Sequence, residues 1–266
     1  LKAAQYVYED KIAIPILLGR KEIILELMEE LDFDSQHIRI IDPKSDEQIP
    51  LLKKYAKTLW TKRQRKGITL YEAEKLMRER NYFAAMMVVE EDAHAMLSGY
   101  SRSYNKILKP ILEIIGKDPA VSKIAATNLL NTSKGPVFIS DTSINIEPNA
   151  EELAKIAQMT AYAVRMFGIE PIMAMVSYSN FGASAHPQAK KIKEAVRLLH
   201  EHYPHLRVDG ELQVDFALNR RMRNDKFPFS KLKDSKVNTL IYPNLDAANA
   251  TYKLLKELET AESIGP

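Results

Sequence analysis

The chain has 266 residues, of which 45% are hydrophobic and 27% charged, which is typical of a globular protein with one large or two modest domains. The formal net charge of +3 is too small to indicate nucleic-acid binding, and the dense basic stretch at residues 53–66 is typical of a solvated helix face. The absence of cysteine excludes disulfides, thiolate metal sites and a cysteine nucleophile.

Strand-like and helix-like segments alternate along the first 120 residues. Residues 1–8 are helix-like, the apolar run Ala13–Leu18 before Gly19 predicts a buried parallel strand, and His37–Ile41 predicts a second strand. Four segments have helical or amphipathic spacing: Lys21–Leu31, Ile49–Gln64, Leu70–Arg80 and Tyr104–Ile115. Phe83–Val89 forms a further apolar run, and Ser98-Gly99 breaks the segment after it.

The same alternation resumes near Val121. Strands are predicted at Val137–Ser140, Pro171–Ser177, Val208–Val214 and Thr239–Tyr242, and helices at Asn149–Met166, His186–His202 and Ala247–Leu258. Strands that alternate with helices indicate an α/β fold with mostly parallel sheets. Because glycines are few and no low-complexity linker occurs, we predict two tightly joined units, residues 1–121 and 122–266.

Several common motifs do not occur in the sequence. It contains no GxGxxG, Walker A, GxSxG or HExxH pattern, which disfavours the usual nicotinamide or ATP enzymes for this stretch of chain. The closely spaced histidines His200, His202 and His205 surround the end of a predicted helix. Their position favours interaction with the helix dipole over a metal site.

The loop from Ser177 to Ser184 follows an apolar strand and precedes a helix. In α/β sheets, ligands bind outside the carboxyl ends of strands, and the start of a helix favours an anion. Small hydroxyl residues and a glycine would expose hydroxyls and backbone N–H groups there. The alternative is a polar connection that only caps the next helix. The candidate ligand residues of this loop are Ser177, Ser179, Asn180, Gly182 and Ser184.

Charged residues supply the other candidates. The guanidinium group of Arg63 suits a phosphate, with surface solvation as the alternative, and Lys109 leaves the same two possibilities. Acidic residues at strand ends or turns could act as bases or metal ligands, or could cap helices and hold turns. These are Asp141, Asp209, Glu211, Asp215 and Asp246.

Six separated segments, in order along the whole chain, resemble the phosphate acetyltransferase family. They are Arg63–Thr69, Met96–Gly99, Phe138–Asp141, Ser177–Gly182, Asp209–Asp215 and Pro243–Asn249. The resemblance implies two three-layer α/β/α subdomains with a cleft in which the thiol of coenzyme A attacks acetyl phosphate. A general base and arginines would assist that reaction. Arg63 matches one phosphate-site arginine of the family, whereas Lys109 replaces a second and lacks its bidentate fork.

The loop Ser179-Asn180-Phe181-Gly182 departs from the family's usual Ser-Thr-Lys-Gly-Ser pattern. It is similar to the C-terminal domain of large bacterial NADP-dependent malic enzymes, as are Arg223–Asp225 and Ser230–Lys233. That resemblance implies a regulatory and oligomerisation domain that binds acetyl-CoA or coenzyme A and has no cofactor of its own. NADP and a divalent metal would belong to the part that decarboxylates malate to pyruvate. The alternatives are an active acetyltransferase that uses acetyl phosphate or phosphate, and a purely structural dimerisation domain.

The ends of the chain indicate a piece of a longer polypeptide, because it starts at Leu1 within a helix-like run and stops at Ile264–Pro266. The resemblance places the family's catalytic aspartate and Ser-Arg pair beyond that point, so we assign no catalytic residue here. We also expect the first subdomain to lack its last strand and helix. The expected ligand-binding residues are Arg63, Lys109, Asp141, Ser177, Ser179, Asn180, Gly182, Ser184 and Asp215.

Two expectations concern location and partners. The sequence contains no secretory signal and no apolar run of membrane-spanning length, so we expect a cytoplasmic protein. The resemblance implies a homo-oligomer, a dimer or higher, without nucleic-acid or membrane partners.

Overall fold

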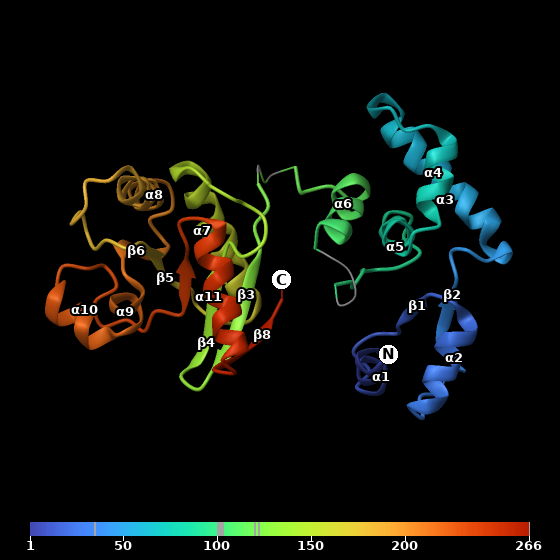
Figure 1. The fold of residues 1–266 in the computed structure, drawn as a ribbon, viewed down its shortest axis with the longest axis horizontal. Coiled ribbons are helices and arrows are strands. Elements are labelled where there is room, and N and C mark those ends of the chain that lie inside the picture. The colour runs from blue at the N-terminus through green and yellow to red at the C-terminus, as the bar shows by residue number, and fades with distance from the viewer. Residues whose placement is uncertain (35, 100–103, 120, 122, 266) are drawn as a thin grey trace. The chain divides into compact units, whose positions relative to one another are not determined.

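The chain forms two compact units, residues 1–118 and residues 119–266 (Figure 1). The computed structural model describes residues 1–34, 36–99, 104–119, 121 and 123–265. The predicted boundary lies between residues 121 and 122, and residue 122 is outside the described residues. Pro266 is also outside them.

The first unit combines helices with a small parallel sheet. Its elements are α1 (Lys2–Glu9), β1 (Ile16–Leu18), α2 (Lys21–Glu30), β2 (Arg39–Ile41), the 3-10 turn η1 (Asp46–Gln48), α3 (Ile49–Arg63), the 3-10 turn η2 (Gln64–Lys66), α4 (Leu70–Met77), α5 (Arg80–Val89) and α6 (Tyr104–Ile114). Among the described residues of this unit, β1 and β2 form a two-stranded parallel sheet, with Ile16 opposite Arg39.

Alternating strand residues divide this unit into layers, because successive side chains of a strand point to opposite faces. Leu17 and Ile40 pack on one face in a cluster with α1 and α2. Leu18 and Ile41 face the other way, into the larger core that α3, α4 and α5 form. The sheet therefore lies between two helical layers.

Helix α5 contains the apolar run Phe83–Val89, for which the sequence predicted neither a helix nor a strand. Its side chains at Tyr82, Phe83, Ala85, Met86 and Met87 are all buried, so it is a core helix with little amphipathic contrast. The predicted helix Leu70–Arg80 corresponds to α4, which ends three residues earlier, at Met77. Arg80 is already the first residue of α5.

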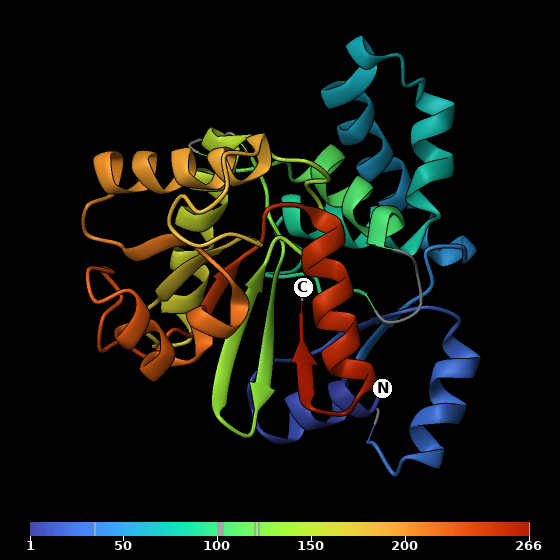
Figure 2. The same cartoon turned by 60° about the vertical axis from the view of Figure 1, so that its left-hand side comes forward.

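The second unit is built around a six-stranded sheet. Its elements are β3 (Thr127–Thr132), β4 (Gly135–Ser140), α7 (Ala150–Met166), β5 (Ile172–Val176), α8 (Pro187–His202), β6 (Arg207–Leu212), α9 (Val214–Leu218), α10 (Arg220–Lys226), β7 (Thr239–Ile241), α11 (Leu245–Glu257) and β8 (Ala261–Ile264). The strand order is β6-β5-β7-β4-β3-β8. The first four strands are mutually parallel, and β3 runs antiparallel to β4 and β8 (Figure 2).

Strand β5 shows why this unit also has three layers. Met173 and Met175 pack into the core formed with α7 and α8. Ala174 and Val176 point to the opposite face, into the core that includes α9 and α11. The predicted α/β fold with mostly parallel sheets is therefore confirmed.

Strand β6 is shorter than predicted, and its end positions the site described below. The register between β5 and β6 shifts after Met175, and a Cβ atom on Gly210 would lie only 2.7 Å from the Met175 carbonyl oxygen. Glycine is therefore needed where the two backbones approach. Strand β6 ends at Leu212 and Val214 already begins α9, whereas the sequence predicted a strand over Val208–Val214.

Candidate functional site

The carboxyl edge of the second unit's sheet gathers most of the predicted residues. Because β4, β5, β6 and β7 are parallel, the segments that follow them leave the sheet at the same edge. Asp141 follows β4, Ser177 follows β5, Asp215 lies just beyond β6, and Asn244 comes after β7. Ligands of α/β sheets bind at such an edge.

The side chain of Glu211 supports the Ser177–Ser184 loop from the end of β6. It is only 1% exposed. Its Oε1 atom accepts hydrogen bonds from the Ser179 hydroxyl at 3.1 Å and the Gly182 N–H at 2.7 Å, and the Phe181 N–H donates to its carbonyl oxygen at 2.9 Å. Its Oε2 atom is buried without a hydrogen-bond partner among the described residues. The sequence identified Glu211 as one of five acidic candidates but could not place it against this loop.

Other N–H groups of the loop are also engaged. Ser179 donates to the Ser177 hydroxyl at 3.2 Å, Ala183 to the Asn180 carbonyl at 3.0 Å, and Ser184 to the Ser179 hydroxyl at 3.1 Å. An anion cradle needs N–H groups that are free to point at the ligand. In this conformation these N–H groups are not free for a ligand, and the hydroxyl groups of Ser177 and Ser179 are buried.

The two residues that distinguish this loop, Asn180 and Phe181, have partners within the unit. Asn180 and Gln213 exchange two hydrogen bonds, from the Asn180 amide to Gln213 Oε1 and from the Gln213 N–H to Asn180 Oδ1, both at 2.8 Å. The Phe181 ring contacts Phe227 and Phe229 edge to face, with centroids 5.0 and 4.9 Å apart. Hydrogen bonds to Gln213 and ring contacts with Phe227 and Phe229 therefore hold the loop in place.

Asp141 holds the turn in which it lies. Its buried carboxylate accepts the N–H groups of Ala126 at 3.1 Å, Ser143 at 3.0 Å and Asn145 at 2.8 Å. These contacts match the turn-stabilising alternative that the sequence left open. Asp215 lies exposed in the first turn of α9. Among the described residues, no group of three or more His, Asp or Glu residues is placed to hold a metal ion.

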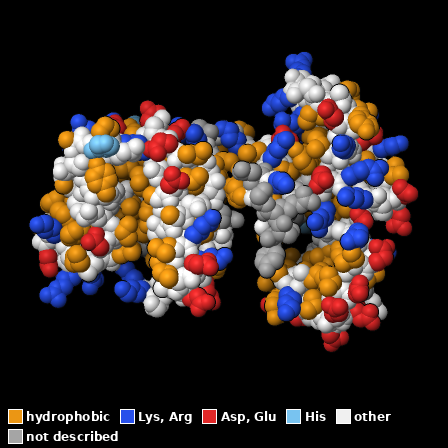
Figure 3. Space-filling view, in the orientation of Figure 1, with side chains coloured by type: hydrophobic (Ala, Val, Ile, Leu, Met, Phe, Trp, Pro, Cys, Tyr) orange, Lys and Arg blue, Asp and Glu red, His pale blue; other side chains and the backbone are white. Residues whose placement is uncertain are grey.

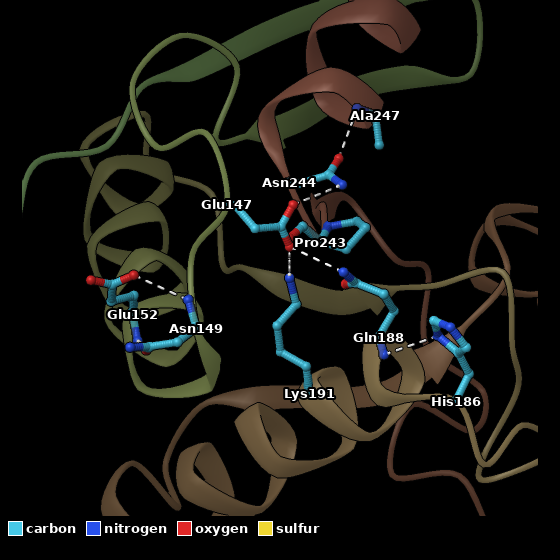
Figure 4. Close-up of polar contacts among 9 residues, drawn as sticks. All are labelled: Glu147, Asn149, Glu152, His186, Gln188, Lys191, Pro243, Asn244 and Ala247. Atoms are coloured by element: carbon cyan, nitrogen blue, oxygen red, sulfur yellow. Dashed lines mark hydrogen bonds and ion pairs between the residues drawn. The ribbon is translucent and has the colours of Figure 1, made fainter.

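A polar cluster around Glu147 joins three segments at the same edge (Figure 4). Glu147, in the connection after β4, forms an ion pair with Lys191 of α8 and accepts weaker hydrogen bonds from Gln188 and Asn244, each at 3.4 Å. Lys191 also donates to the Pro243 carbonyl at 3.1 Å. The hydrogen bond from Lys191 is the main reason why the pKa of Glu147 is lowered. The sequence gave no signal for this cluster, because its members are far apart along the chain.

In the first unit, Arg63 lies at the end of α3 and contacts α6. Its guanidinium group pairs with the Glu113 carboxylate at 3.3 Å and reaches the Glu113 carbonyl at 3.4 Å, and its side chain is mostly buried. Tyr82 donates to the other carboxylate oxygen of Glu113, and burial raises the pKa of this tyrosine. Lys109 is exposed one helical turn before Glu113. The structure therefore brings Arg63 to the helix that carries Lys109.

The comparisons with known proteins agree with this architecture. A family model described as phosphate acetyl/butaryl transferase matches residues 1–266, and the chain belongs to that family. A solved phosphotransacetylase from Streptococcus pyogenes superposes with a TM-score of 0.85 and is 33% identical. That match covers 100% of this chain and 80% of the other.

Relatives of two kinds show similar identity to this chain. The NADP-dependent malic enzyme of Haemophilus influenzae is 37% identical over 270 aligned positions, which span all of this chain but 35% of the enzyme. The phosphate acetyltransferase of Thermoanaerobacterium thermosaccharolyticum is 34% identical, with 81% of its length covered. The chain thus spans about a third of the malic-enzyme relative. None of the helices in the described ranges is long and apolar enough to cross a membrane.

Proposed function

We propose that this chain is an acetyl-CoA-responsive regulatory and assembly module of a protein whose malic-enzyme part lies elsewhere in the polypeptide. One observation carries the proposal: the hydrogen-bond donors that acetyl transfer would need, in the Ser177–Ser184 loop and at Arg63, already bind carboxylates of the protein itself. A phosphate acetyltransferase stabilises a departing phosphate with donors aimed at it. In this chain the corresponding donors are engaged with the protein itself.

The loop after β5 supplies the first part of this argument. The Ser179 hydroxyl and the Gly182 N–H both donate to the Glu211 carboxylate, and the Ser184 N–H donates to the Ser179 hydroxyl. Phosphate binding by these groups would require those hydrogen bonds to break. Leaving a buried carboxylate such as Glu211 without its donors costs about 1–3 kcal/mol or more. This cost disfavours phosphate transfer at the loop.

Two candidate cations of the first unit, Arg63 and Lys109, supply the second part. The Arg63 guanidinium group is held by Glu113, and the exposed Lys109 offers a point charge without a bidentate fork. The exposed Lys109 can still attract the phosphates of a bound ligand. We therefore infer that the module binds acetyl-CoA or coenzyme A without turning it over. We assign it no cofactor, and we assign NADP and a divalent metal to the malic-enzyme part.

A calorimetric titration of acetyl-CoA into the whole protein, paired with an assay of malate oxidation, tests this function. We expect binding, and we expect a change in malate oxidation over the same concentration range. Lys109→Ala should weaken acetyl-CoA binding about tenfold by removing a charge-assisted contact. Lys106→Ala, which removes another exposed lysine of α6, should not. The absence of binding at millimolar acetyl-CoA would rule out the regulatory function.

The second candidate is an active phosphate acetyltransferase. It is favoured by the relative from T. thermosaccharolyticum, of which this chain covers 81%. An assay of acetyl phosphate plus coenzyme A decides between the two candidates, because turnover of about 1–1000 per second would establish an enzyme. Light scattering with and without acetyl-CoA tests the assembly role. A stable homo-oligomer that neither binds nor turns over acetyl-CoA would leave the purely structural dimerisation domain.

A further inference from the structure

Arg63 is a mostly buried cation whose contacts are long. Figure 3 shows Lys, Arg, Asp and Glu side chains together on the surface over α3 and α4, where water solvates them, whereas the Arg63 side chain is only 17% exposed. Its Nη2 atom lies 3.3 Å from Glu113 Oε1, and its Nη1 atom lies 3.4 Å from the Glu113 carbonyl oxygen. Its buried Nε atom has no hydrogen-bond partner among the described residues. Because a strong guanidinium–carboxylate pair has two N–H···O contacts of about 2.7–2.9 Å, this pair is loose.

The hydroxyl group of Tyr82 accounts for the loose pair. It donates to Glu113 Oε2 at 2.5 Å from helix α5, and Tyr82 is only 7% exposed. Burial, together with this hydrogen bond, raises the pKa of Tyr82, so the hydroxyl group stays protonated and remains a donor. Because Oε2 is taken, Glu113 can offer only Oε1 to the guanidinium group of Arg63. The guanidinium group is therefore left partly without acceptors.

A second tyrosine of the same core provides a comparison. Tyr55 of α3 is fully buried and donates to Asp92 Oδ2 at 2.5 Å, and burial raises its pKa as it does for Tyr82. Asp92 takes part in none of the ion pairs between described residues. The two tyrosines therefore bind a carboxylate in the same way, but only Tyr82 shares its carboxylate with an arginine.

Both contacts of Arg63 fall on the last turn of α6. Glu113 is the last residue but one of this helix, where backbone carbonyls have no partner within the helix and a cation is favourable. The pair therefore ties the end of α3 to the end of α6. Helix α6 is the last described helix of the first unit before the connection to the second. Loss of the pair would release the end of α6 from α3.

We propose that Glu113 is a built-in competitor for Arg63, and that Tyr82 keeps this competitor weak enough for an anionic group of a ligand to displace it. An anion with two oxygens would satisfy Nε and Nη2 together, because these N–H groups lie along one edge of the guanidinium plane. Glu113 would keep its hydrogen bond to Tyr82 and turn Oε1 to water, which its 19% exposed side chain can reach. The contact is thus autoinhibitory. This role of Glu113 rests on the function proposed above, because the bound ligand of the module would supply the anion.

Calorimetric titrations of inorganic phosphate into the whole protein, at constant ionic strength, test this competition. Glu113→Gln should bind phosphate about tenfold more tightly than the wild type, because it removes the competing charge. Tyr82→Phe should bind phosphate several-fold more weakly, because the freed Oε2 lets Glu113 pair with Arg63 through both oxygens. Tyr55→Phe removes the matched hydroxyl group and should leave phosphate binding unchanged.

A double variant locates the gain in phosphate affinity, because adding Arg63→Ala to Glu113→Gln should abolish it. Loss of stability would weaken binding in every variant, so opposite changes in Glu113→Gln and Tyr82→Phe distinguish competition from a purely structural role. If Glu113→Gln does not gain affinity, or if Tyr82→Phe and Tyr55→Phe change alike, the proposal is wrong. Acetyl-CoA binding without the gain for phosphate would contradict the competitor and leave the proposed function standing. The gain without acetyl-CoA binding would do the opposite.

Discussion

Glu211 is the residue on which the conformation of the candidate loop depends most directly. A carboxylate that is 1% exposed is unusual unless donors compensate for its desolvation, and here the Ser179 hydroxyl and the Gly182 N–H both donate to Oε1. Hydrogen bonds to a charged acceptor are worth about 1.5–3 kcal/mol each. The loop and the end of β6 therefore stabilise each other.

Replacing Glu211 by Gln tests this dependence. The amide would present a buried N–H₂ group where Oε2 now has no partner, and it would accept the two remaining hydrogen bonds as a neutral group. We expect the free energy of unfolding to fall by about 1–3 kcal/mol, measured by urea denaturation. Glu262→Gln, at an exposed position of β8, should change it by less than about 0.5 kcal/mol. Equal effects of the two substitutions would contradict the role given to Glu211.

At the scale of elements, the order of strands and helices could be predicted, but two kinds of element could not. Strands β4, β5 and β7 are apolar runs in the sequence, whereas β3 reads Thr-Asn-Leu-Leu-Asn-Thr and lacks that signal. Its Asn128 is fully buried because Gly265 and Thr142, distant in sequence, satisfy its amide. Helix α5 was ambiguous for the opposite reason, since an apolar run without periodicity fits a buried helix or a strand equally well.

The candidate site was predictable to a similar extent. The sequence placed the Ser177–Ser184 loop at a strand end, but the partners of that loop lie about 30 residues further along the chain. The segment around Arg223, which carried part of the family resemblance, has a structural role. The buried Arg223 guanidinium group donates to the carbonyls of Phe216, Ala217, Leu232 and Ser235. Such contacts depend on the tertiary fold and leave no local pattern.

The cluster around Glu147 predicts a dependence of stability on pH. The hydrogen bond from Lys191 lowers the pKa of Glu147 below its ordinary value of 4.5. Its contribution is therefore complete above that value and is lost as the pH falls through the lowered pKa. Because Glu147 is half exposed, we expect Glu147→Gln to reduce the free energy of unfolding by at most about 1 kcal/mol at pH 7.

The measurement is urea denaturation of both proteins between pH 7 and pH 3. The difference between wild type and Glu147→Gln should shrink as the pH falls below 4.5. Glu262→Gln again serves as the control, because its side chain is exposed. A difference that stays constant over this range would mean that Glu147 contributes nothing through its charge.

For the whole molecule, the division into two units has consequences for how the chain unfolds. The core cluster around Phe83 contains residues of the first unit, and the cluster around Ile156 contains residues of the second. The sequence has a single tryptophan, Trp60, which packs against the first of these clusters. Tryptophan fluorescence therefore reports on the first unit, whereas far-ultraviolet circular dichroism reports on both.

Two matched substitutions use this difference. Phe83 is fully buried and contacts Tyr55 edge to face, so Phe83→Ala should lower the free energy of unfolding seen by Trp60 fluorescence by about 3–5 kcal/mol. Ile156→Ala, at an equally buried position of the second unit, should lower the stability seen by circular dichroism by about 2–5 kcal/mol and leave the fluorescence transition in place. If Ile156→Ala moves the Trp60 transition as far as Phe83→Ala does, the two units unfold as one cooperative body. In that case a ligand bound to either unit would stabilise both.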